Sequence, residues 1–191
     1  MAVANPYARV FLSLARARVP YLVVGAYGVN LYGEQAGIII RTEDCDLLLP
    51  PDARILARAN RTLRNLKFAL EAGDEPLPDD DRVVLAGIVR ARACVRAFHR
   101  KTRIDLPLQI AGYEFADLWP KRRTFRVGGV EVNVAPLEDI LRSKELAGRP
   151  KDQLFLVTYK DALDQLLRPK PLPAPLRALV RAKTRKKKRK R

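Results

Sequence analysis

Apolar residues recur along the chain with two different periods, and these periods predict its elements. Helical spacing of apolar positions predicts a first helix over residues 5–18. A short apolar run at 21–24 predicts a buried strand, which Gly25 ends before a second helix at 26–32. A strand, a glycine turn and a helix N-terminus in this order leave backbone N–H groups free, and these groups favour an anion.

The stretch RTEDCDLLLP, residues 41–50, joins two carboxylates to an apolar run that predicts a buried strand. Side chains of a strand alternate between its faces, so Asp44 and Asp46 share one face and Cys45 takes the other. Carboxylates roughly 6 to 7 Å apart repel by on the order of 2.5 kcal/mol at an effective dielectric constant near 20. The pattern therefore predicts a counter-charge beside this strand.

The chain between residues 52 and 110 continues with helices, a loop and strands. The sequence predicts a helix at 52–72, an acidic loop at 73–81, a helix at 82–90, and strands at 93–98 and 103–110. Asp105 interrupts the last of these strands between two apolar neighbours. A carboxylate in an apolar strand is typical of a functional site.

The C-terminal third predicts a β-hairpin at 124–134, which turns at its Gly-Gly pair, and then helices that begin at Pro136 and Pro150. The apolar positions of the last helix predict a packed face made of Leu154, Val157, Ala162, Leu163 and Leu166. The whole order of elements predicts an α+β fold, with a mixed β-sheet flanked by helices and a helical C-terminal part at about 136–168.

Length and composition fit one globular domain over residues 1–168. No apolar run reaches the ~20 residues that a membrane-spanning helix needs, and no secretion signal is recognised, so a cytoplasmic protein without a membrane partner is expected. Cys45 and Cys94 belong to no metal-binding cluster and are expected to be reduced, buried thiols.

The formal net charge is +16, and nine basic residues with no acid occupy the tail from Arg181 to Arg191. The tail follows a proline-rich stretch, so residues 169–191 are expected to form a linker and a disordered basic arm. Arms of this kind bind nucleic acid through its phosphates, although a solubilising tail without selectivity has the same composition.

A divalent cation with oxygen ligands, Mg²⁺ or Mn²⁺, is the most direct counter-charge for the paired carboxylates. Such a cation usually brings substrate phosphates with it. Asp44, Asp46 and Asp105 are therefore the candidate metal ligands and catalytic residues.

Four features together resemble the nucleotidyltransferase superfamily with the DNA polymerase beta-like fold. They are the glycine turn at Gly25, the RTxDxD strand, the third acid Asp105, and a late Lys…Arg-x-Lys-Asp segment. The closest likeness is to AbiEii-like toxin nucleotidyltransferases, over about residues 20–167. The resemblance implies that three carboxylates hold two metals, and that NMP passes from an NTP to an acceptor. It also implies a nucleotide site made of Gly25, Ala26, Arg41, Thr42, Lys144, Arg149, Lys151 and Asp152.

The resemblance and the basic tail together imply RNA, such as a tRNA 3′ end, as the acceptor, and a toxin that pairs with a cognate antitoxin. Two alternatives stay open. One is a nucleotidyltransferase fold that binds nucleic acid or a partner without turnover, because Ala26 and Phe155 depart from the family pattern. The other is an enzyme that modifies a small-molecule antibiotic, which gives the basic tail no role.

Overall fold

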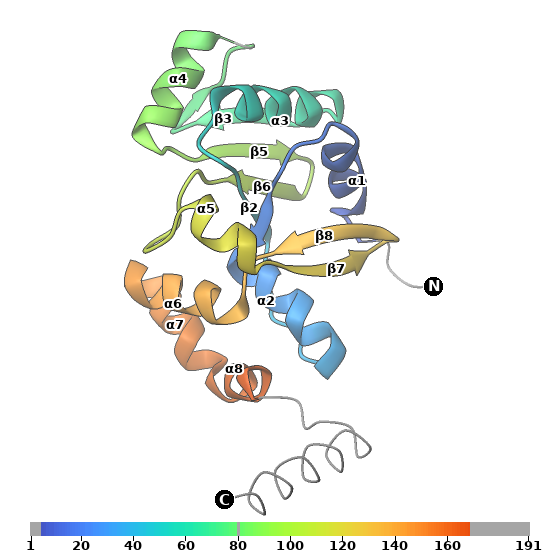
Figure 1. Cartoon of the computed structure of the whole chain (residues 1–191), viewed down its shortest axis with the longest axis vertical. Coiled ribbons are helices and arrows are strands. Elements are labelled where there is room, and N and C mark those ends of the chain that lie inside the picture. The colour runs from blue at the N-terminus through green and yellow to red at the C-terminus, as the bar shows by residue number, and fades with distance from the viewer. Residues whose placement is uncertain (1–4, 80, 169–191) are drawn as a thin grey trace, which may run out of the picture.

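Eight strands form a single sheet in the computed structural model, which describes residues 5–79 and 81–168 (Figure 1). The strands are β1 (Leu22–Val24), β2 (Asp44–Leu48), β3 (Ala69–Ala72), β4 (Glu75–Pro76), β5 (Val95–His99), β6 (Thr102–Leu106), β7 (Arg123–Val127) and β8 (Val130–Val134). Their order is β4-β3-β5-β6-β2-β1-β8-β7. β2 pairs with β6 and β1 with β8 in parallel, while the other neighbours are antiparallel. The mixed sheet confirms the predicted α+β fold.

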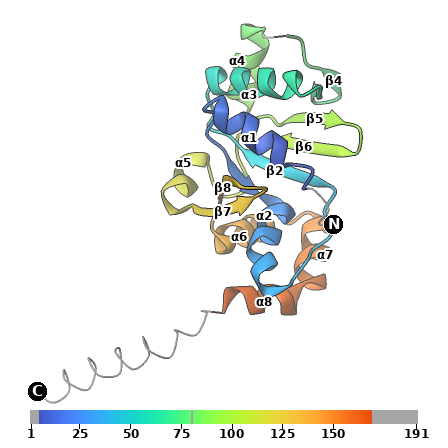
Figure 2. The same ribbon diagram turned by 90° about the vertical axis from the view of Figure 1, so that its right-hand side faces the viewer.

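Helices surround the sheet at both ends of the molecule. They are α1 (Ala8–Arg16), α2 (Gly25–Gly33), α3 (Ala53–Asn65), α4 (Arg82–Ala91), α5 (Phe115–Leu118), α6 (Leu137–Ala147), α7 (Pro150–Thr158) and α8 (Lys160–Leu167), with short 3₁₀ turns η1 (Glu34–Ala36) and η2 (Trp119–Lys121). Figures 1 and 2 show α3 and α4 at one end and α7 and α8 at the other. None of the helices in the described residues is long and apolar enough to cross a membrane. The predicted linker and basic tail, 169–191, lie outside the described residues.

The helix predicted for residues 52–72 is too long. Asp52 caps α3 as its sequence position implies, by accepting hydrogen bonds from the N–H groups of Arg54 and Ile55 at 2.7 and 3.0 Å. However, α3 ends at Asn65, and the chain turns at Lys67, whose φ is +70°. The following residues form β3 on the edge of β5. That pairing partner lies far along the chain, so the local pattern does not reveal it.

The last helix also differs from the prediction, because it breaks at Tyr159 into α7 and α8. Leu154 and Val157, expected on its packed face, are 68% and 76% exposed. The packed side of α7 carries Asp152, Phe155 and Tyr159 instead, which follow one another at helical spacing. Asp152 is 1% exposed, and the helix is rotated so that this carboxylate faces inward.

Candidate active site

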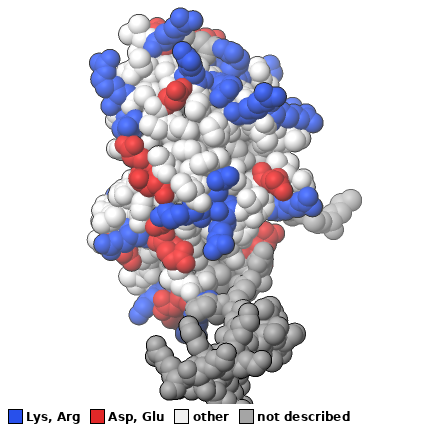
Figure 3. Space-filling view, in the orientation of Figure 1, with Lys and Arg blue, Asp and Glu red and all other residues white. Residues whose placement is uncertain are grey.

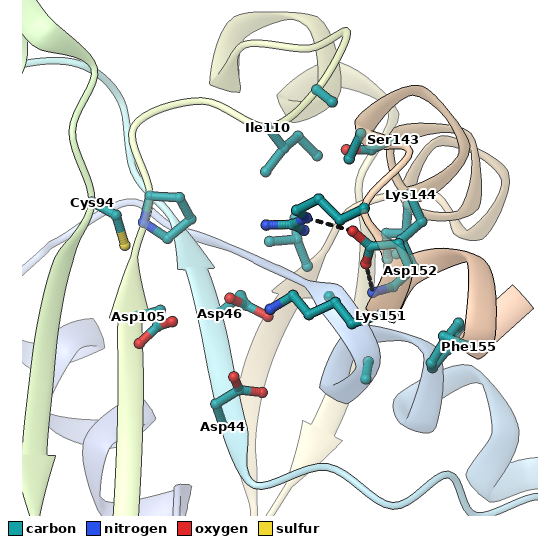
Figure 4. A pocket seen from close by; sticks show the side chains of 18 of the residues that line it. Asp44, Asp46, Cys94, Asp105, Ile110, Ser143, Lys144, Lys151, Asp152 and Phe155 are labelled. Atoms are coloured by element: carbon teal, nitrogen blue, oxygen red, sulfur yellow. Dashed lines mark hydrogen bonds and ion pairs between the residues drawn. The ribbon is translucent and has the colours of Figure 1, made fainter.

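Two neighbouring parallel strands bring the three predicted acids together. In the register of β2 and β6, Asp44 lies opposite Arg103, and Asp46 lies opposite Asp105. One ligand oxygen from each of Asp44, Asp46 and Asp105 lies within 4.8 Å of the others. Figure 4 shows the three carboxylates beside one another on the two strands. Cys45 points to the opposite face, where it is fully buried as expected.

The concentration of negative charge is visible in the acid–base properties of Asp46. Burial, followed by the neighbouring carboxylates Asp44 and Asp105, raises its pKa to about 6, although Lys144 and Lys151 act in the opposite direction. A divalent cation would relieve this repulsion. Three carboxylates that each offer one oxygen at this spacing are ligands that Mg²⁺ and Mn²⁺ accept, so the residues present fit such an ion.

Arg103 is a member of this cluster that the sequence interpretation missed. Its Nε donates to Asp105 Oδ1 at 2.9 Å and its Nη2 donates to Asp105 Oδ2 at 2.7 Å. These hydrogen bonds raise the pKa of Arg103. The signal was present in the sequence, because Arg103 precedes Asp105 by two residues and so shares its face of the strand. Arg103 thus neutralises the third acid, Asp105, from the same strand, β6.

The glycine turn after β1 lies directly against the acids. Val24, the last residue of β1, pairs with Asp46, and Gly25 then starts α2 with a φ of +65°. A Cβ atom at Gly25 would lie 1.9 Å from Asp46 Oδ2. Gly25 is therefore required both by its backbone conformation and by the close approach of a carboxylate.

We expect Gly25→Ala to displace Asp46 and to lower the free energy of unfolding by about 1–3 kcal/mol, since the substitution adds a clash to the strain of a positive φ. Gly37→Ala is a matched control, because Gly37 has a φ of +70° and a Cβ atom added there would meet nothing within 4 Å. Chemical denaturation of both variants separates the cost of the clash with Asp46 from the cost of the positive φ. Equal destabilisation by the two substitutions would show that the clash with Asp46 is unimportant.

The opposite wall of the site is cationic and is organised by Asp152. Lys144 Nζ of α6 donates to Asp152 Oδ1 at 3.0 Å, and Arg149 Nε donates to Asp152 Oδ2 at 2.5 Å (Figure 4). Lys144 also lies 4.5 Å above the centre of the Phe155 ring. Burial favours the neutral carboxyl group, yet the hydrogen bonds from Arg149 and Lys144 hold the pKa of Asp152 below its ordinary value. Asp152 therefore positions two cations.

A pocket of about 880 Å³ lies between the acids and the cations. Most of the predicted site residues line it, namely Gly25, Ala26, Asp44, Asp46, Asp105, Lys144, Arg149, Lys151 and Asp152. Arg96, Arg103, Cys94 and Ser143 line it too, and the sequence interpretation did not include them in the site. The volume is within the usual range for small-molecule sites, roughly 300–1,000 Å³.

Two predicted nucleotide-site residues lie outside the pocket lining. The Arg41 side chain is 87% exposed and pairs with the equally exposed Glu43 at 3.8 Å. Thr42 donates from Oγ1 to Asp44 Oδ1 at 3.0 Å. Thr42 thus holds one of the acids in place, while Arg41 extends into solvent.

No protein-family model and no curated protein matches the chain. Among solved structures, it is similar to the solution structure of the antibiotic-resistance factor ANT(2″)-Ia, with 14% sequence identity and a TM-score of 0.46. The similarity covers 95% of this chain and 94% of that one. At this level of similarity, the functional argument rests on the geometry of the site.

Proposed function

We propose that this protein is a metal-dependent nucleotidyltransferase, which transfers NMP from an NTP to a hydroxyl group of an RNA such as a tRNA 3′ end. One observation carries the proposal. Three carboxylates with ligand oxygens within 4.8 Å of one another share an 880 Å³ pocket with Lys144 and Arg149. This arrangement provides ligands for metal ions on one wall and charge for a triphosphate on the other.

The acids have separate roles in the proposed reaction. Asp44, Asp46 and Asp105 would hold the divalent cations, which would supply positive charge near the entering and leaving oxygens. Asp105 accepts the proton of the acceptor hydroxyl, whose oxygen forms a new bond to the α-phosphorus as the bond to pyrophosphate breaks. Arg103 gives each oxygen of Asp105 one hydrogen bond, so each oxygen keeps a further lone pair for this step.

The glycine turn and the cationic wall bind the triphosphate. The backbone N–H groups of Gly25 and Ala26 are offered to the β- and γ-phosphates at the N-terminus of α2. Lys144 neutralises charge that develops on the pyrophosphate. Arg149 is 59% exposed although Asp152 holds its Nε, so its guanidinium is accessible to a phosphate oxygen.

Charge in the pocket supports an anionic acceptor. Among the described residues, the acids that line the pocket are the three of the metal site and Asp152, which is buried between two cations. A polycationic antibiotic would need further carboxylates, whereas Lys151 suits a phosphate of an RNA end. A toxin role and a cognate antitoxin remain predictions from the sequence resemblance.

The acceptor is tested by incubating the protein with each α-labelled NTP, Mg²⁺ or Mn²⁺, and either total RNA or a cationic aminoglycoside. We expect label in RNA with one or more of the four NTPs and none in the aminoglycoside. Label in the aminoglycoside alone would contradict RNA as the acceptor but would support the nucleotidyltransferase activity. If the protein binds RNA but transfers label to no acceptor, the proposed enzymatic activity is contradicted.

A second candidate function is a nucleic-acid-binding module without turnover. The observation that favours it is the Arg103–Asp105 pair, since an arginine that permanently neutralises the third acid would close the metal site. The same incubation decides between the two functions, because only the enzyme transfers the α-label to an acceptor.

A further inference from the structure

A second cationic surface lies apart from the pocket, on α1, on α3 and in the turn that follows α1. We call it the arginine face and define it by five exposed residues, Arg9, Arg16, Arg18, Arg54 and Arg58. None of them lines the pocket. α1 and α3 contact each other, and Figures 1 and 2 both show them side by side. The five residues therefore belong to one surface of the molecule.

The arginines follow from the helical periods of α1 and α3. Leu56 and Leu63 of α3 are fully buried, and Arg54 and Arg58 project from the opposite side of the helix, one turn or roughly 6 Å apart. On α1, Arg9 and Arg16 are two turns apart, about 10.5 Å along the helix axis. The same periods that bury the apolar sides of both helices therefore direct the arginines into solvent.

The charge of the arginine face is not balanced locally. Neither α1 nor α3 contains an acid, and Asp52 at the α3 N-cap already binds two backbone N–H groups. Within residues 5–79 and 81–168, none of the five side chains forms an ion pair. Figure 3 shows Lys and Arg side chains gathered over the end of the molecule where Figure 1 places α3 and α4. Like charges one helical turn apart destabilise a helix, so an anion bound at this face would be stabilising.

The side chains of this surface suit phosphates of a nucleic-acid backbone. Every cation of the face is an arginine, the residue whose planar fork of donors matches phosphate oxygens. The aromatic residues Tyr7 and Phe11 are buried, so the face offers no ring on which an unpaired base can stack. The apolar sides of α1 and α3 lie in the core and are not available for insertion into a lipid surface.

We propose that the arginine face binds the phosphate backbone of a nucleic-acid double helix. The choice of RNA as that nucleic acid rests on the proposed function, while the surface itself rests on the five arginines. A small acceptor held in the pocket does not reach these residues.

The test is anisotropy titration of a labelled RNA duplex of about 20 base pairs at several KCl concentrations. Arg54→Gln/Arg58→Gln is compared with Lys160→Gln/Arg168→Gln, which removes the same charge from exposed residues of α8 and its C-cap, at the other end of the molecule. We expect the first variant to weaken binding on the order of tenfold and to reduce the salt slope by about 1.8, for two lost phosphate contacts. The α8 variant should bind like the wild type.

Equal weakening by both variants would overturn the arginine face, because binding would then depend only on net charge. Binding to vesicles that contain phosphatidylserine, with the same dependence on Arg54 and Arg58, would assign the face to a membrane surface instead. The duplex is titrated without NTP, so a failed transfer assay leaves this result intact. If the wild type transfers NMP to RNA and the Arg54→Gln/Arg58→Gln variant binds the duplex as tightly as the wild type, the arginine-face proposal is overturned and the proposed function stands.

Discussion

Asp46→Asn is expected to reduce NMP transfer on the order of 10³-fold while making the metal-free protein more stable. Under the proposed function, activity should fall because the amide would not supply the negative charge that binds a metal ion. Stability rises because the substitution removes a buried charge that Asp44 and Asp105 repel. At pH 7 the gain in the free energy of unfolding should be about 1–3 kcal/mol, which corresponds to the rise in the Asp46 pKa from 3.8 to about 6.

The pH dependence of Asp46 has a defined sign. Its folded pKa of about 6 lies above the ordinary value of 3.8, so its contribution to stability is complete below about pH 4 and is lost as the pH rises to about 6. Urea unfolding at pH 4, 5, 6 and 7 should show this loss in the wild type and not in Asp46→Asn. Mg²⁺ should raise the melting temperature of the wild type only.

The exposed Asp164 of α8 provides a control, since Asp164→Asn makes the same chemical change away from the site. It should leave transfer and the Mg²⁺ response unchanged. Transfer by Asp46→Asn at the wild-type rate would disprove the metal assignment. A less stable Asp46→Asn would show instead that the carboxylate has a structural partner.

Asp152→Ala is expected to lower the free energy of unfolding by about 3–5 kcal/mol, the usual cost of breaking a buried ion pair from one side. Asp152 is 1% exposed, and its removal leaves Lys144, which is 15% exposed, without its anion. Urea denaturation at pH 7 measures the change. Lys144→Met/Asp152→Ala should recover part of the loss, because the double variant no longer buries an unpaired charge.

Asp152→Ala also tests the positioning role of Asp152 in the proposed reaction. Lys144→Met alone should lower the rate of transfer, and Asp152→Ala should lower it comparably because both cations lose their orientation. The pKa of Asp152 is below its ordinary value, so its stabilising effect is present at neutral pH and is lost as the pH falls below about 4. Asp164→Ala should change neither quantity. If the Asp152→Ala variant is as active and as stable as the wild type, Asp152 has no positioning role in the site.

The acid side of the site was predictable from the sequence because a strand has a period of two. Asp44 and Asp46 share a face, and Cys45 is buried behind them, for purely local reasons. Arg103 obeys the same rule relative to Asp105 and was overlooked, although the signal was local. The glycine turn was predictable too, but the partner of Gly25 is a carboxylate of the neighbouring strand, which only strand pairing reveals.

The chain by itself determined the elements with strong periods, the face of β2 that carries the acids and the excess of positive charge. The tertiary structure decided what depends on distant partners. Strand β3 forms because β5 provides its edge, and α7 is rotated because Lys144 and Arg149 meet Asp152 inside the protein. The arginine face, likewise, exists because α1 and α3 pack side by side. Local periods decide which side of an element is polar, but burial and charge pairing between distant segments decide what that side meets.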